Sequence, residues 1–130
     1  MSFIDNNNIR LSMKSLDYLW EKQRIASENI ANNDTPGYKA KILKFEDELD
    51  KKLDIFRIAK MPNRKKIQKA IEGSNMRVET SKAESTRMDG NNVNTDVEQI
   101  ELARAQLQYQ FQIAQINDQF ARLRTVLGKR

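Results

Sequence analysis

Carboxylates are the side chains with the clearest capacity for chemistry in this 130-residue chain. They gather in two segments, residues 46–50 and 96–101. Paired carboxylates can act as general acid and base or bind hard metal ions. Basic residues follow them at helical spacing, as Lys52 follows Glu48, and exposed i,i+4 ion pairs explain that arrangement. We therefore assign no catalytic residue and no metal ligand to these segments.

Histidine and cysteine are both absent from the chain. Their absence excludes a serine triad, a histidine-bound metal, a thiol-based zinc site and a disulfide framework. Residues 88–96, MDGNNVNTD, have a superficial likeness to a calcium loop, but they lack its aspartate spacing and its closing glutamate. The segment is better interpreted as a turn that leads into a capped helix. We expect no cofactor and no enzymatic activity.

A basic run carries much of the net charge of +5. Residues 57–69, RIAKMPNRKKIQK, hold six cations and no acid. Such a run can bind phosphate or anionic lipid, so a helical hairpin that binds nucleic acid through residues 57–69 stays open as an alternative function. A solvated loop is the plainer interpretation. Trp20 and Phe111 fall on helix stripes, where packing is a better explanation than base stacking.

The apolar pattern predicts two long terminal helices. Residues 8–33 place apolar side chains at steps of three and four, which is typical of an amphipathic helix. Residues 95–127 contain neither glycine nor proline, and Gly128 is a plausible stop signal. Thr95 and Glu98 form the pattern of a capping box at the start of this second helix. Its length would be about 50 Å at 1.5 Å per residue.

The C-terminal helix has apolar residues on two sides. A hairpin of two helices buries only one stripe, so we expect part of the second stripe to contact another subunit. The alternative is that the middle of the chain folds back over this stripe. The first stripe is Val93, Val97, Ile100, Leu107, Phe111 and Ala114, and the second is Leu102, Ala105, Tyr109, Ile113, Ile116, Phe120, Leu123 and Leu127. The predicted assembly interface comprises Ile9, Met13, Leu16, Trp20, Ile30, Val97, Ile100, Leu107, Phe111, Ile116, Phe120 and Leu123.

We predict an all-α chain in which the two terminal helices pack as a coiled-coil-like pair. The spacing of Phe45, Leu49, Leu53 and Phe56 predicts a short third helix over residues 43–58, which Pro62 would end. Residues 76–80 favour an extended segment, and residues 80–88 are expected to be poorly ordered. The chain would form one domain with three parts: residues 1–40, a variable middle over 41–92, and residues 93–130.

The N-terminus has no apolar core and no small-residue cleavage site, so a cleaved signal peptide is not expected. No apolar stretch approaches the roughly 20 residues that span a bilayer, and no membrane span is expected. Export from the cytoplasm would therefore use a route that leaves the chain uncut.

Dense turn chemistry follows the first helix, in the stretch ASENIANNDTPGYKAK at residues 26–41. This stretch resembles the signature A-N-x-x-T-P-G-[YF]-K-A of bacterial flagellar axial proteins. DGNNV at residues 89–93, before a long terminal helix, is similar to the basal-body rod members of that family, the proximal ones in particular. The resemblance covers residues 16–56 and 89–127, and Asn94 departs from it where an acid is expected. The matching residues are Ala31, Asn32, Thr35, Pro36, Gly37, Tyr38 and Lys39, with Asp89, Gly90, Asn91, Asn92 and Val93.

The resemblance implies a structural subunit of the flagellar basal-body rod, located in the periplasm. Such a subunit would assemble through its terminal helices with copies of itself and with other rod and basal-body proteins, and would help to transmit motor torque. It would contact the flagellar type III export apparatus during secretion, without cleavage. It would bind no nucleic acid. An adaptor or chaperone of flagellar export is a further alternative.

Thr35-Pro36-Gly37-Tyr38 predicts a type II turn, because proline fixes φ at its second position and glycine supplies the positive φ at its third. The Asn and Asp residues before it can satisfy the last helical carbonyls. We hypothesise that the turn ends the first helix and directs the chain onto a neighbouring subunit. A turn that acts within one subunit stays open.

Overall fold

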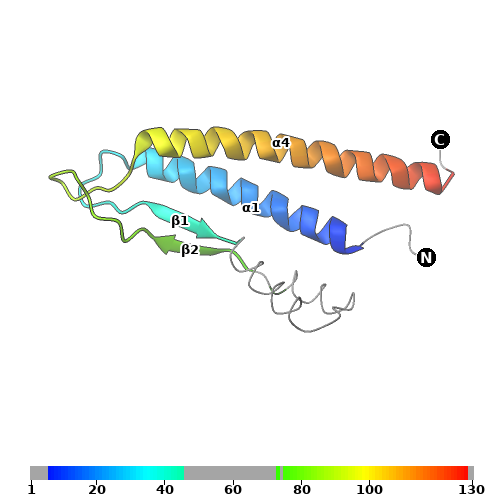
Figure 1. Cartoon of the computed structure of the whole chain (residues 1–130), viewed down its shortest axis with the longest axis horizontal. Coiled ribbons are helices and arrows are strands. Elements are labelled where there is room, and N and C mark those ends of the chain that lie inside the picture. Colours follow the sequence, from blue (N-terminus) through cyan, green and yellow to red (C-terminus); the bar gives the residue numbers. More distant parts are fainter. Residues whose placement is uncertain (1–5, 46–72, 74, 129–130) are drawn as a thin grey trace.

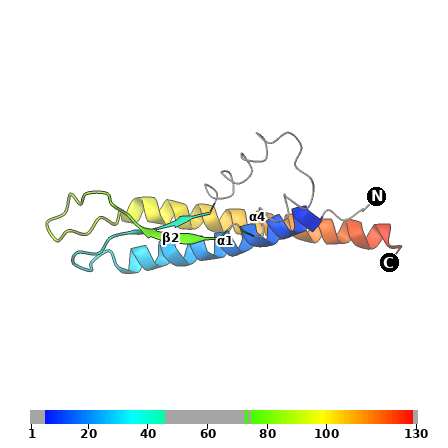
Figure 2. The same cartoon turned by 90° about the horizontal axis from the view of Figure 1, so that it is seen from below.

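The computed structural model describes residues 6–45, 73 and 75–128. Its elements are two long helices, α1 (Asn6–Ala31) and α4 (Thr95–Val126), and two short strands, β1 (Lys41–Lys44) and β2 (Arg77–Thr80). The helices run antiparallel, and α1 lies between α4 and the strands in the view of Figure 1. Figures 1 and 2 both place the two termini at one end of the molecule and the loops that follow α1 and precede α4 at the other.

The core is thin and centres on α1. Tyr18 and Leu19 of α1 form a buried cluster with Phe45, which follows β1, and the rings of Tyr18 and Phe45 stack with centroids 5.4 Å apart. Ala105 of α4 is fully buried. Its small side chain permits a close approach of the two helices. The core therefore joins α1 to the sheet on one side and to α4 on the other.

The buried face of α1 differs from the predicted stripe. Met13 and Trp20 are 58% and 62% exposed, whereas Ile25, which lies outside that stripe, is buried. The difference arises because α1 contacts two neighbours, β1 and α4, so its buried face is broader than the single stripe of a helical hairpin. Ile9, Leu16 and Ile30 of the predicted stripe are partly buried.

The prediction of an all-α fold is wrong in one respect, since β1 and β2 form an antiparallel two-stranded sheet. Lys41 pairs with Thr80, and Lys44 pairs with Arg77. The extended segment expected near residues 76–80 is confirmed as β2. Leu43, expected to begin a third helix, lies instead in β1, where pairing with a distant strand overrides the local helical spacing. Most of the predicted helix 43–58, and the basic run 57–69, lie outside the described residues.

Residues 80–88, between β2 and α4, were expected to be poorly ordered, and in the structure hydrogen bonds connect them to other parts of the chain. Ser81 N–H donates to the carbonyl of Ala40 at 2.7 Å. The Arg87 guanidinium donates to Asn33 Oδ1 at 3.1 Å. These polar side chains and amides bond to parts of the chain that are distant in sequence, and composition alone does not reveal such contacts.

The ends of α4 match the prediction to within a residue. The N-cap is Asn94, whose side chain accepts from Val97 N–H at 3.3 Å, so the predicted cap at Thr95 is one residue late. Gly128 follows the helix with φ +69° and donates to the Thr125 carbonyl, as expected of a stop signal. With 32 residues, α4 is about 48 Å long. No helix among residues 6–45 and 75–128 is both long and apolar enough to cross a membrane.

Candidate assembly interface and the junction that positions it

The chain leaves α1 through the predicted turn at residues 35–38. Gly37 has φ +73°, and Tyr38 N–H donates to the Thr35 carbonyl at 3.2 Å. With proline at the second position, this is the geometry of a type II turn. Asn32 Nδ2 donates to the Glu28 carbonyl at 2.8 Å and so satisfies one of the last acceptors of the helix. The turn therefore ends α1 and reverses the chain towards β1.

A buried asparagine from the second motif completes the end of α1. Asn91 is 0% exposed. Its Nδ2 donates to the carbonyls of Asn32 at 2.9 Å, Asn33 at 3.0 Å and Thr35 at 2.9 Å. Its Oδ1 accepts from Val93 N–H at 2.8 Å, just before α4. One side chain thus links the last carbonyls after α1 to the segment that leads into α4.

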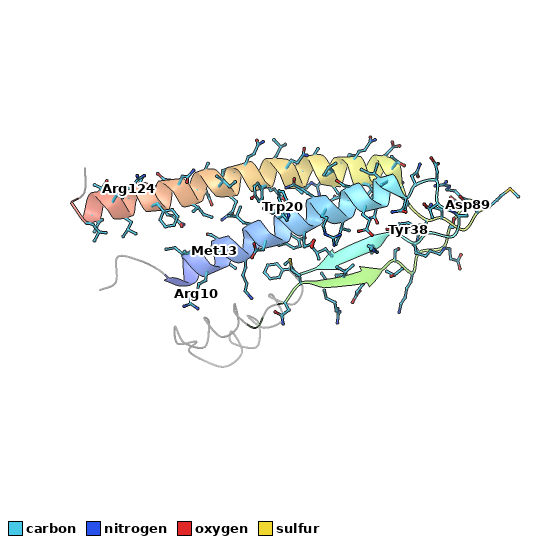
Figure 3. All side chains as sticks on the ribbon, turned by 180° about the vertical axis from the view of Figure 1, so that it is seen from behind. Arg10, Met13, Trp20, Tyr38, Asp89 and Arg124 are labelled. Atoms are coloured by element: carbon cyan, nitrogen blue, oxygen red, sulfur yellow. The ribbon has the colours of Figure 1, made fainter. Side chains whose placement is uncertain are left out.

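The two motifs also meet through their backbones. Gly37 N–H donates to the Asp89 carbonyl at 2.7 Å, and Lys39 Nζ donates to the Gly90 carbonyl at 2.6 Å. Gly90 has φ +79°, and a Cβ atom there would lie 3.7 Å from the Cα of Gly37. Figure 3 shows Tyr38 and Asp89 at this same end of the molecule. We call the set of contacts between residues 31–41 and 85–93 the junction.

Asn92 extends the junction towards the sheet. Its N–H donates to the Tyr38 carbonyl at 3.2 Å, and its Oδ1 accepts from Ala40 N–H at 2.6 Å. All of these contacts lie within one chain, which is the alternative that the sequence left open for the turn. A contact between the turn and a neighbouring subunit stays a prediction.

Asn29, beside the junction, is a positioning residue that sequence reasoning missed. It is 0% exposed, and its side chain both donates to the carbonyl of Lys41 at 3.0 Å and accepts from Lys41 N–H at 2.9 Å. The side-chain amide bonds both the N–H and the carbonyl of Lys41, as a neighbouring strand would, and so connects the start of β1 to α1. The signal available in the sequence was an asparagine beside the apolar positions of an amphipathic helix.

Ion pairs connect α4 and β1 to α1. Lys22 Nζ lies 3.2 Å from Glu101 on α4, and the two side chains are only 26% and 29% exposed. Lys41 of β1 pairs with Glu28 of α1. The hydrogen bond from Lys41 is the main cause that holds the pKa of Glu28 below its ordinary value. Each pair joins two elements that are adjacent in space but distant in the chain.

The two apolar stripes of α4 differ in how far they are exposed to solvent. Leu102, Ala105 and Tyr109 of the second stripe turn towards α1 and are partly or fully buried. Leu107 and Phe111 of the first stripe are 68% and 63% exposed. Only part of the second stripe was expected to contact another subunit, and its members Ile113, Phe120 and Leu127 are exposed. Their contact with a neighbouring subunit stays a prediction.

The predicted assembly residues divide by environment. Five of them lie partly buried between elements, namely Ile9, Leu16, Ile30, Ile116 and Leu123. The others are exposed apolar side chains, namely Met13, Trp20, Val97, Ile100, Leu107, Phe111 and Phe120. Val97, Ile100, Leu107 and Phe111 form a row along one side of α4, which we call the outer face. A row of large exposed apolar side chains on one helix is typical of a surface that binds another protein.

No group of three or more His, Cys, Asp or Glu side chains that could hold a metal ion occurs in the part of the chain that the structure describes. The most prominent features of the described residues are the junction and the exposed apolar outer face of α4.

Comparisons with known proteins agree on one family. No family model matches the chain. Curated proteins named flagellar basal body rod protein FlgB do match. The protein from Bacillus subtilis (strain 168) is 38% identical over 106 residues, which cover 82% of this chain and 81% of that protein. Those from Buchnera aphidicola subsp. Acyrthosiphon pisum and Escherichia coli (strain K12) are 32% and 29% identical, over 94% and 92% of this chain and 95% and 91% of their own lengths. A relative of that identity over most of both chains shows the family, and this chain belongs to the flagellar basal body rod proteins of the FlgB type.

Proposed function

We propose that this chain is a structural subunit of the flagellar basal body rod and has no catalytic role. Family membership supports the place of action, since the matching relatives are named basal body rod proteins. The outer face of α4 is the observation that carries the mechanism. Leu107 and Phe111 are more than half exposed in the single chain. Burial against a neighbour would remove this apolar surface from water and favour assembly.

The junction gives the subunit a fixed shape for that assembly. Helix α1 and helix α4 are held at one end by Asn91 and along their length by the Lys22–Glu101 pair. A fixed helix pair presents its exposed side chains in one geometry, which reduces the conformational entropy lost on binding. Copies of this chain and other rod proteins are the proposed partners, and the packed helices would transmit torque.

Export through the flagellar apparatus without cleavage is part of the same proposal and rests on family membership alone. A rod subunit ends in the finished organelle, whereas an export chaperone does not. That difference separates the proposal from its nearest alternative.

Deletion and complementation of the gene tests the function. We expect electron microscopy to show loss of hooks and filaments on deletion and their return with the gene. We also expect labelled protein in purified basal bodies. Intact flagella after deletion would refute a rod function, and protein absent from basal bodies would indicate a chaperone instead.

A further inference from the structure

A groove with an apolar floor runs between β1 and the first turns of α4. Its volume is about 400 Å³, and Tyr18, Ile25 and Ala26 of α1 are among the residues that line it. Ile42 of β1 and Val97 of α4 also line it and are 41% and 50% exposed. Part of the apolar lining is therefore still in contact with water in the single chain.

The charges around this groove are paired with one exception. Lys22 pairs with Glu101, and Lys41 pairs with Glu28. Glu98 also lines the groove and is partly buried, yet no cation lies within ion-pair distance of it in the described part of the chain. The nearby Asn29 side chain is uncharged and does not neutralise it.

The position of Glu98 is unfavourable for an ionised carboxylate. Burial is the main cause that raises its pKa above the ordinary value. The polar side chain of Asn29 acts against this shift, and the nearby negative charge of Glu101 adds to it. An acid near a helix N-terminus is favoured by the helix dipole, but the exposed Asp96 already supplies one in the same turn. A partly buried charge without a counter-charge lowers stability, and such groups are enriched at functional sites.

We infer that this groove seats a segment of a neighbouring rod subunit that carries a lysine or arginine beside apolar side chains. The cation would lie against Glu98, and the apolar side chains would lie between Ile42 and Val97. This inference rests on the proposed function and adds to it a surface separate from most of the outer face. A counter-charge from a neighbour would offset the burial of Glu98, and electrostatic complementarity of this kind fixes the register of a partner.

Glu98→Gln tests the inference, because the substitution removes the charge and keeps the shape. Asp96→Asn is the matched control on the same helical turn. Two quantities are compared at neutral pH: the urea midpoint of the isolated full-length chain and the number of copies in purified basal bodies. We expect Glu98→Gln to leave the urea midpoint unchanged or higher and to reduce the copies in basal bodies about tenfold or more, as loss of one partner of a partly buried charge pair predicts. Asp96→Asn should leave incorporation unchanged.

Three results would overturn the inference. Normal incorporation of Glu98→Gln would show that no partner uses the charge. A lower urea midpoint would show that a cation of the same chain satisfies Glu98. Equal losses for Glu98→Gln and Asp96→Asn would show a general effect of charge at the start of α4. Absence of the wild-type chain from basal bodies would instead refute the proposed function. The inference that a rod subunit binds in the groove would then fail with it.

Discussion

The side-chain amide of Asn91 lies 2.9 Å from the carbonyl oxygen of Asn32, a residue 59 positions earlier in the chain. This bond joins the end of the first long helix to the segment that starts the second. It holds the end of α1 against the start of the segment that leads into α4.

Asn91→Ala should lower the free energy of unfolding by roughly 2–4 kcal/mol, because Val93 N–H and the Asn33 carbonyl lose the partner that Asn91 provides. Asn33→Ala is the control. The side chain of Asn33 accepts only from Arg87 among the hydrogen bonds described above and is partly exposed, so its loss should cost well under half as much. Urea denaturation followed by circular dichroism measures both. Equal losses would show that Asn91 does not govern the junction.

Gly37→Ala and Gly90→Ala should each destabilise the chain by about 1–2 kcal/mol, because both positions have positive φ. Gly128→Ala has the same strain but lies at the end of α4, where only the last turn can fray. Hydrogen exchange at Asn92 N–H, which donates to the Tyr38 carbonyl across the junction, reports the difference. Faster exchange is expected for the first two variants and no change for Gly128→Ala. Slow exchange in all three would contradict the role of the close backbone contact.

Leu107→Ser and Phe111→Ser should change the stability of the isolated chain by no more than about 0.5 kcal/mol, as is usual for exposed positions. Both should abolish incorporation into the rod if the outer face is an interface. Leu19→Ala, at a position only 7% exposed, provides the contrast and should cost about 2–5 kcal/mol. Denaturation curves and motility in soft agar separate the two classes. Motile cells that carry Phe111→Ser would argue against the outer face.

Glu28→Gln should show a pH-dependent loss of stability. The pKa of Glu28 is held below its ordinary value of 4.5, so its ionised form favours the folded state. That contribution is complete above about pH 4.5 and is lost as the pH falls through the folded-state pKa. The difference in unfolding free energy between wild type and variant should therefore shrink on acidification. The same difference should also shrink when both proteins carry Lys41→Met. If the difference persisted with Lys41→Met, the Glu28–Lys41 pair would be excluded as its source.

Local signals in the sequence predict the long helices and the turn. The uninterrupted run before Gly128 fixes the length of α4, and Pro36-Gly37 fixes the type of turn. The length of α4 and the type of turn both depend on residues that are neighbours in the chain. The family signature likewise marks residues that gather at the junction.

The remaining features depend on contacts between distant residues. Strand β1 exists because Lys41 and Lys44 pair with residues beyond position 76, and the capping role of Asn91 requires two motifs to meet. The two stripes of α4 have the same helical period, so periodicity cannot decide which one faces α1. The side chains of Leu102 and Ala105, packed on α1, decide it in the structure.

We propose that neighbouring subunits cover the outer face of α4. The chain has no cysteine, so Phe111→Cys provides a unique site for maleimide labelling. We predict rapid labelling in the isolated chain, strong protection in purified basal bodies, and restored labelling after the basal bodies are dissociated. Labelling at the same rate in intact basal bodies as in the isolated chain would contradict the claim.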